Sequence, residues 1–180
     1  MNESLKSEQR RLARARRRAF VAERGHSRFP TALLRQHLAL SPCTIVASYA
    51  AVAGEPDMSD VEAMLRSSGV VIAHPRIDGD IMTFRLTGDQ RPDVSALGFM
   101  QPPSDAPVVT PAVILAPLVG FDRQMNRLGQ GGGHYDRAFV ALPHARRIGI
   151  AWSAQLLPRV TCDPWDGRLH AIVTEKEWIE

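Results

Sequence analysis

The strongest constraint on the fold is the alternation, along most of the chain, of short apolar runs with segments of helical composition. Residues 44–52 and 112–119 are apolar enough for buried strands, whereas residues 81–86 alternate in polarity as a half-exposed strand does. Strands that alternate with helices predict an α/β fold with a mainly parallel sheet and helices on both of its faces. The expected strands are residues 44–52, 70–73, 81–86, 112–119, 147–152 and 170–174, and the expected helices are residues 4–24, 31–40, 59–67 and 134–142.

Proline marks two expected interruptions of this pattern. The strand at 70–73 should end at His74-Pro75. Residues 88–111 are rich in Pro, Gly and Asp and should form one long connection before the strand at 112–119.

The length and composition suit one globular domain. The chain has 180 residues, of which 44% are hydrophobic and 23% charged. No apolar run approaches the roughly 20 residues needed to cross a bilayer, and the start lacks the apolar stretch of a signal peptide. We therefore expect a single domain over residues 1–180, located in the cytoplasm. Cys43 and Cys162 are far apart and lack a CxxC partner, so we expect buried thiols and neither a disulfide nor a zinc site.

The first 28 residues form a basic segment with nine Lys or Arg and three acidic residues, a formal charge of +6, whereas the remainder carries −3. Residues 4–24 contain no Pro or Gly and begin at Ser4, which can cap a helix. A basic arm indicates an anionic partner, either nucleic acid, a multiply charged nucleotide or a polyglutamate tail; a solvated face is the alternative. The helix would carry two stripes, an apolar one of Leu5, Leu12, Ala15 and Ala19 and a cationic one of Lys6, Arg10, Arg14 and Arg18.

The glycine-rich segment 127–137 is the most informative motif, because it follows a strand and leads into a helix. Four glycines in the five positions 129–133 permit positive φ angles and let a ligand approach the backbone closely. Their N–H groups and the positive end of the next helix predict a phosphate site; a flexible turn is the alternative. The segment lacks the Lys-Ser or Lys-Thr of a Walker A loop, and His134 stands where a dinucleotide-binding GxGxxG needs its last glycine.

Two aspartates near this segment are candidate magnesium ligands. Asp136 lies at the start of the helix after the glycines, and Asp166 lies in the turn-rich Asp163-Pro164-Trp165-Asp166. Carboxylate oxygens are what Mg²⁺ needs when it bridges nucleotide phosphates. The alternatives are that Asp136 stabilises the helix dipole and that Asp166 is a turn residue.

These motifs resemble the signature of a known family. Phe121-Asp122, followed by Arg127-Leu128-Gly129-x-Gly131-x-Gly133-x-Tyr135-Asp136-Arg137, is similar to the pattern of the 5-formyltetrahydrofolate cyclo-ligases, also called methenyltetrahydrofolate synthetases. The resemblance extends over nearly the whole chain, through Lys6-x-x-Gln9-Arg10, Ser48-Tyr49 followed by Glu55, and Gly149-Ile150-Ala151 with Gln155, Asp166 and Ile172-Val173-Thr174-Glu175.

The resemblance implies a three-layer α/β/α sandwich similar to the CoA-transferase group. It also implies a reaction in which ATP and 5-formyltetrahydrofolate give 5,10-methenyltetrahydrofolate, ADP and phosphate, with Mg²⁺ as cofactor. In such enzymes the formyl oxygen is phosphorylated first, and N10 of the folate then displaces the phosphate. Phosphoryl transfer of this kind needs mainly alignment and charge neutralisation, which agrees with a glycine cradle flanked by cations.

The resemblance assigns roles to particular residues of this chain. ATP would contact Lys6, Arg10, Arg127, Leu128, Gly129, Gln130, Gly131, Gly132, Gly133, His134 and Tyr135. The folate would contact Arg10, Glu55, Gln130, Gly131, Gly132, Gly133 and His134, and Asp136 and Asp166 would hold Mg²⁺. Arg14 and Arg18 would reach the glutamate tail of the folate. The chain departs from the family pattern at Leu118, Gln130, Gly132, His134 and His170.

Two other functions remain open at this point. The basic helix alone would suit a nucleic-acid-binding module, although aromatic residues are only 6% of the chain and a stacking surface is poorly supplied. A paralogue that keeps the ATP loop but acts on another formyl or carboxyl compound is the second alternative. We expect a monomer whose partners are small molecules and not a membrane, and we favour these small molecules over nucleic acid.

Overall fold

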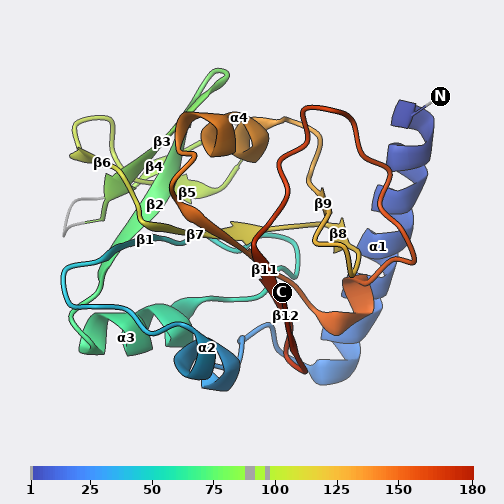
Figure 1. The fold of residues 1–180 in the computed structure, drawn as a ribbon, viewed down its shortest axis with the longest axis horizontal. Coiled ribbons are helices and arrows are strands. Elements are labelled where there is room, and N and C mark those ends of the chain that lie inside the picture. The colour runs from blue at the N-terminus through green and yellow to red at the C-terminus, as the bar shows by residue number, and fades with distance from the viewer. Residues whose placement is uncertain (1, 88–91, 96–97) are drawn as a thin grey trace.

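An eight-stranded mixed sheet forms the middle layer of the fold, in the order β12-β11-β10-β7-β1-β2-β3-β6 (Figure 1). This computed structural model describes residues 2–87, 92–95 and 98–180, so residues 88–91 and 96–97 of the expected long connection lie outside the described residues. The five neighbouring strands β11, β10, β7, β1 and β2 pair in parallel. At the edges, β12 pairs antiparallel with β11, β3 with β2, and β6 with β3. The strands are β1 (Ile45–Ala47), β2 (Val71–Asp78), β3 (Ile81–Leu86), β6 (Val108–Val109), β7 (Val113–Pro117), β10 (Arg146–Ile150), β11 (Ala171–Val173) and β12 (Trp178–Ile179).

Helices cover both faces of this sheet. Val113 and Leu115 of β7 belong to the core beneath α2 (Ala32–His37) and α3 (Ser59–Ser67). The alternate residues Ile114 and Ala116 face the opposite core, which contains Ala138 and Phe139 of α4 (His134–Ala141). Because successive side chains of a strand point to opposite faces, one apolar run supplies both cores. The predicted three-layer α/β/α fold with a mainly parallel sheet is confirmed.

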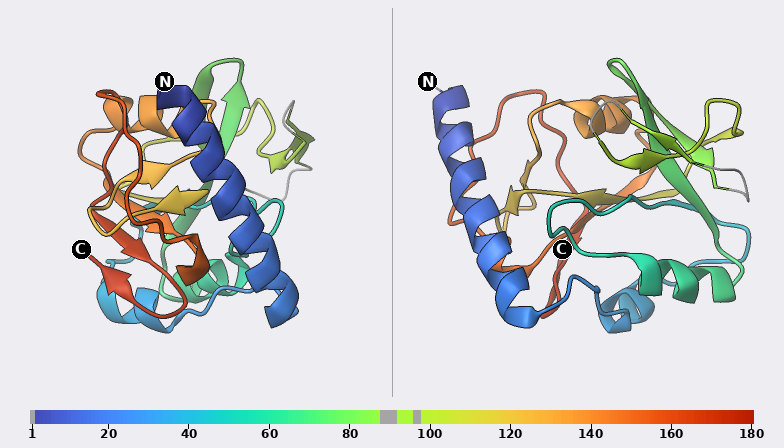
Figure 2. Two further views of the ribbon diagram at one scale, coloured as in Figure 1. Left: turned by 90° about the vertical axis from the view of Figure 1, so that its right-hand side faces the viewer. Right: turned by 180° about the vertical axis from the view of Figure 1, so that it is seen from behind.

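The long helix α1 (Asn2–Arg24) lies across the end of the sheet at which β7 and β10 finish (Figure 2). It packs against the 3₁₀ turn η1 (Ser153–Gln155), which follows β10, and against β8 (Gly120–Phe121), which follows β7. Gly120 permits this approach, because a Cβ atom there would lie 3.3 Å from the Ala13 side chain. Ligands of open α/β sheets bind outside the carboxyl ends of the strands, so α1 borders the expected site.

The predicted apolar stripe of α1 faces solvent. Leu5 and Leu12 are 47% and 42% exposed, and the buried residues of α1 are Lys6, Ala13 and Arg17. The buried basic residues have carboxylate partners, which the helix periodicity alone could not indicate. Within the described residues, neither this 23-residue helix nor any other has the apolar length required to cross a membrane.

Several sequence predictions need correction. The strand predicted at 70–73 continues through Pro75 to Asp78; β1 pairs with β2 only as far as Ala73, and a proline is tolerated where one side of a strand is free. The strand predicted at 44–52 ends at Ala47. Cys43 and Cys162 are exposed, because both lie in turns and loops outside the core. Short strands missed by the sequence are β4 (Asp93–Val94), β5 (Met100–Gln101), β6, β8, β9 (Arg127–Leu128) and β12.

Candidate active site

The glycine segment connects β9 to α4 beside α1. Gly131 and Gly133 have φ angles of +111° and +66°, which side-chain-bearing residues rarely adopt. Gly133 directly precedes α4, so the unpaired N–H groups of the first helical turn open onto the loop. At Gly132 a Cβ atom would lie 2.9 Å from the ring of His134. The loop therefore needs glycine for its backbone at two positions, and a side chain at 132 would require the ring of His134 to move.

Side chains on both sides hold this loop in place. From α1, Arg10 Nε donates to the carbonyl of Gly129 at 3.1 Å, and Arg14 Nη2 donates to Oε1 of Gln130 at 2.6 Å. From α4, Arg137 Nη2 lies 3.0 Å from both the Gly132 carbonyl and Nδ1 of His134. Because a guanidinium can only donate, Nδ1 of His134 is the acceptor, and the ring proton sits on Nε2.

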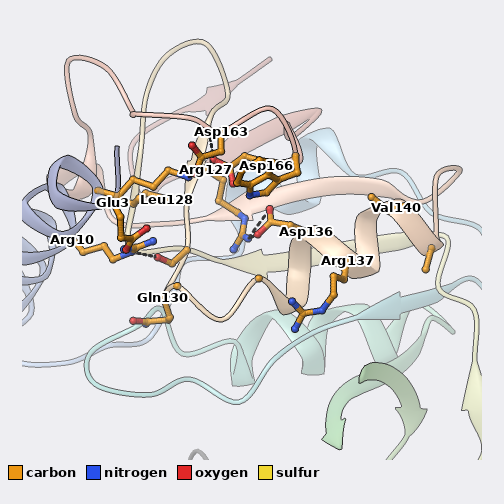
Figure 3. Close-up of a pocket in the computed structure, with 16 residues that line it drawn as sticks. Glu3, Arg10, Arg127, Leu128, Gln130, Asp136, Arg137, Val140, Asp163 and Asp166 are labelled. Atoms are coloured by element: carbon orange, nitrogen blue, oxygen red, sulfur yellow. Dashed lines mark hydrogen bonds and ion pairs between the residues drawn. The ribbon is translucent and has the colours of Figure 1, made fainter. Parts of the chain in front are cut away.

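Asp136 forms a charge pair with Arg127 behind the loop (Figure 3). Arg127 Nη2 lies 3.2 and 3.1 Å from the two carboxylate oxygens, and the Arg127 side chain is only 5% exposed. The backbone N–H of Gly167 donates to Oδ1 of Asp136 at 3.2 Å. This bond brings the loop that contains Asp166 next to Asp136.

Lys6 at the start of α1 pairs with two carboxylates. Its Nζ lies 2.7 Å from Asp163 Oδ2 and 2.6 Å from Asp166 Oδ2. Burial by itself lowers the pKa of Lys6, but hydrogen bonds to both aspartates outweigh it and raise the pKa. Lys6 is therefore a cation held beside the proposed metal ligands, and Asp163 is a site residue that sequence reasoning missed.

The first cavity, of about 670 Å³, has charged walls (Figure 3). Cations from α1 and β9 line it together with the carboxylates of Asp136, Asp163 and Asp166. The glycine loop closes one side, and the exposed apolar side chains of Val140 and Trp165 flank it. Such a mixture of backbone donors, cations and carboxylates suits a phosphorylated ligand that brings a metal ion.

The second cavity, of about 400 Å³, lies on the other side of the loop and has mainly apolar walls. Ile77, Met82, Phe99 and Leu118 contribute to these walls, and Leu118 occupies a position where the family pattern has glycine. Gln130 and Gly133 line both cavities, so the glycine loop is the wall between them.

A buried pair of opposite charges, Arg17 and Glu55, lines the second cavity. Desolvation raises the pKa of Glu55, and Arg17 opposes this rise. Desolvation likewise lowers the pKa of Arg17, against the effect of Glu55. Burial also raises the pKa values of Tyr49 and Tyr135, so both phenols stay neutral around this pair.

The residues predicted to bind ATP divide between the two cavities. Lys6, Arg10, Arg127, Leu128, Gly129, Gln130, Gly131 and Gly133 surround the first, whereas Gly132, His134 and Tyr135 line the second. Of the predicted folate residues, Glu55, Gln130, Gly132, Gly133 and His134 line the second cavity, and Arg10 and Gly131 line only the first. Sequence reasoning missed Arg17, Asp163 and Trp165. His170 accepts a hydrogen bond from the backbone of Arg147 and lines neither cavity.

Fold and site together define an α/β enzyme with a glycine-rich phosphate loop between two ligand cavities. Comparison with known proteins identifies the family within this class of enzymes: the model of the 5-formyltetrahydrofolate cyclo-ligase family matches residues 2–175. The chain belongs to this family.

Individual relatives agree with the family match. The chain is 29% identical to the 5-formyltetrahydrofolate cyclo-ligase of Escherichia coli K12 over 181 residues, which cover 93% of this chain and 99% of that one. It is 43% identical over 63 residues to the cyclo-ligase of Mycoplasma pneumoniae, covering 34% and 38% of the two chains. Among solved structures, the 5,10-methenyltetrahydrofolate synthetase of Aquifex aeolicus is similar with a TM-score of 0.76 and 24% identity, over 97% of this chain and 92% of that one. This structural likeness supports the fold.

Proposed function

We propose that this protein catalyses the ATP-dependent cyclisation of 5-formyltetrahydrofolate to 5,10-methenyltetrahydrofolate, with release of ADP and phosphate. Family membership supports the reaction. The observation that carries the proposal is the glycine loop as the wall between a charged cavity and an apolar one. A nucleotide in the first cavity and a folate in the second would meet at this wall, where the phosphoryl group must pass from one to the other.

The chemistry requires positioning more than acid or base groups. The formyl oxygen attacks the γ-phosphorus and ADP leaves; N10 then attacks the formyl carbon, loses its proton, and the phosphate departs with the former formyl oxygen. Phosphorylation turns a poor leaving group into a good one, so the protein must align reactants and neutralise charge. Arg10 and Lys6 on α1, Arg127 on β9 and the N–H groups at the start of α4 supply that neutralisation.

The carboxylates of the first cavity fit a magnesium ion that arrives with the nucleotide. Among the described residues, no cluster of three or more His, Cys, Asp and Glu side chains forms a complete protein cage for a metal. Mg²⁺ usually keeps several waters and binds one or two carboxylates together with substrate phosphates, so Asp136 and Asp166 are a sufficient set. Each carboxylate already has a cationic partner, Arg127 or Lys6, which would turn toward the phosphates. Bound there, the metal would neutralise phosphate charge.

The second cavity suits the folate. Its apolar walls match the flat rings, and Glu55 offers a carboxylate to the N–H groups of the pterin. Arg14 and Arg18 line the same cavity from α1 and would attract the carboxylates of a glutamate tail. We further propose that residues 1–180 act as one domain, as a monomer in the cytoplasm.

The methenyl chromophore tests the function directly. Purified protein supplied with 5-formyltetrahydrofolate, ATP and magnesium should generate the absorbance of 5,10-methenyltetrahydrofolate, and omission of ATP should abolish it. The absence of both the chromophore and ATP hydrolysis would contradict the proposal. ATP hydrolysis stimulated by a different formyl or carboxyl compound would instead favour the paralogue, whereas tight, salt-sensitive RNA binding without a folate effect would favour the nucleic-acid module.

Replacement of Gly131 by alanine should lower turnover by roughly 10- to 100-fold, because a Cβ atom strains its φ of +111° and displaces the loop from both ligands. Gly25 is the matched control, since its φ is +78° at the end of α1, a Cβ atom there would meet nothing within 4 Å, and it lines neither cavity. Gly25→Ala should cost comparable stability and leave kcat unchanged. Equal activity losses in the two variants would show that the effect is general strain.

Folate affinity should fall with decreasing pH, and the fall should begin at a pH above 4.5, the ordinary pKa of a glutamate side chain. The raised pKa of Glu55 means that its carboxylate takes up a proton at a pH where an exposed glutamate remains charged, and the neutral acid accepts hydrogen bonds less well. Arg17, Tyr49 and Tyr135 surround Glu55 and keep their charge states in this range. Folic acid dissociation constants measured from pH 4 to 8 would check this, and Glu55→Gln should remove the dependence above the range in which the carboxylates of the ligand itself take up protons.

A further inference from the structure

The ion pair between Arg17 and Glu55 is the most deeply buried charge pair at either cavity. Nη1 of Arg17 lies 3.4 Å from Oε1 of Glu55, and the two side chains are 3% and 4% exposed. Arg17 comes from the middle of α1, whereas Glu55 lies in the loop after β1. Both line the second cavity, where mainly apolar side chains accompany them.

Glu55 is fixed by several donors. Its Oε1 also accepts from Gln130 Nε2 at 3.0 Å, and its Oε2 accepts from the backbone N–H of Val52 at 3.2 Å. A carboxylate has about four lone-pair positions, so one remains for a ligand. The bond to Gln130 also ties the carboxylate directly to the glycine loop.

Arg17, by contrast, has donors to spare. It has five N–H groups, but its bond to Glu55 is the single hydrogen bond that the described residues provide. Its Nε is buried and lacks any partner among those residues. Buried donors are nearly always paired, since an unpaired one is unfavourable. A ligand acceptor in the second cavity would satisfy the guanidinium.

A purely structural role explains this pair poorly. A buried ion pair seldom stabilises a fold more than an apolar pair of similar volume, because desolvation offsets the attraction. The pair instead presents an acceptor and a donor next to one another in the lining of a ligand cavity. Such an arrangement complements a ring edge on which donors and an acceptor stand next to one another.

The pterin of the substrate carries such an edge. Its 2-amino group and N3–H are donors, and its 4-oxo group is an acceptor. We propose that Arg17 donates to the 4-oxo group while Glu55 accepts from the 2-amino group, so that Arg17 is a substrate-binding residue which selects 4-oxo pteridines. This inference rests on the proposed function and specifies how its substrate is oriented. The 4-oxo group neighbours N5 on the ring, so this contact also fixes the side that bears the formyl group.

Folic acid and aminopterin provide the test, because the 4-oxo group of folic acid is an amino group in aminopterin, a change that also removes the proton from N3, while both ligands keep the 2-amino group. Wild-type protein should bind folic acid more tightly, since a 4-amino group meets the donors of Arg17 with further donors. Arg17→Met should reduce the ratio of the two dissociation constants by about tenfold or more, as expected for a lost hydrogen bond to a charged group. Arg11→Met, an exposed change on the same helix, should preserve the ratio.

Arg17→Met alone leaves Glu55 as an unpaired buried charge and could therefore misfold. The same substitution is for that reason also tested in protein that already carries Glu55→Gln. Glu55→Gln should weaken both ligands similarly, and the addition of Arg17→Met to Glu55→Gln should again lower the ratio. An unchanged ratio in both backgrounds, with wild-type protein still forming the methenyl chromophore, would overturn the role of Arg17. Wild-type protein that binds neither pteridine and forms no chromophore would instead overturn the proposed function.

Discussion

Replacement of Asp136 by asparagine is expected to lower the kcat of cyclisation by on the order of 100-fold or more, since the loss of a metal ligand costs about 3 kcal/mol in the transition state. The amide keeps the size of the side chain but removes its charge. The half-saturating concentration of Mg²⁺ should rise as well. A chromophore assay over a magnesium titration at saturating ATP measures both effects.

Asp136→Asn should also lower the stability of the fold, because Arg127 is almost fully buried and would lose its charged partner. Since the Asp136 side chain is 20% exposed, we expect a loss of about 1–3 kcal/mol and not the larger cost of a fully buried pair. Thermal unfolding should report this loss, so activity must be measured well below the lowered melting temperature.

Asp60→Asn is the matched control for Asp136→Asn. Asp60 lies in the first turn of α3, as Asp136 does in α4, but it is half exposed and away from both cavities. The control removes the favourable interaction with the helix dipole, worth about 0.3–1 kcal/mol, and should leave turnover unchanged. Wild-type turnover in Asp136→Asn would remove Asp136 from the metal role.

The parallel sheet was predictable because its strands are continuous apolar runs. Residues 113–116 supply side chains to two cores, so they stay apolar at every position, and local composition is enough to identify them. Two-residue strands such as β8 and β9 have no periodicity to detect. The continuation of β2 through Pro75 depends on where β1 ends, which is a tertiary fact that local sequence does not contain.

The residues of the candidate site also fall into those that local sequence predicts and those that depend on the fold. The glycine loop and Asp136 are contiguous in sequence, so local reasoning finds them. Arg17 is one of nine basic residues in the first 28, and its partner Glu55 is 38 positions away. Its burial could not be inferred from helix periodicity, which assigned the inward face to Leu5 and Leu12. Asp163 could not be predicted either, because only the fold brings it next to Lys6.

Lys6→Met should reduce kcat/KM for ATP by about 100-fold, since a buried cation that can contact phosphate oxygens is worth roughly 3 kcal/mol. Lys6 is 5% exposed and lies between two carboxylates at the edge of the charged cavity. Methionine keeps the length and apolar stem of the side chain, so the variant loses the charge with little change in packing. The effect should fall on ATP and spare the KM for 5-formyltetrahydrofolate, because the second cavity does not include Lys6.

A structural role of Lys6, in which it merely fastens α1 to the loop at 163–166, makes a different prediction. Asp163→Asn weakens that attachment while it retains both Lys6 and Asp166, and on the structural view it should impair ATP use as severely as Lys6→Met. We expect a much smaller loss, because the ammonium remains available to phosphate. Arg11→Met, which changes an exposed charge on the same helix, should have wild-type kinetics. Equal losses in Lys6→Met and Asp163→Asn would assign Lys6 to the fold, whereas a selective loss in Lys6→Met would assign it to the nucleotide.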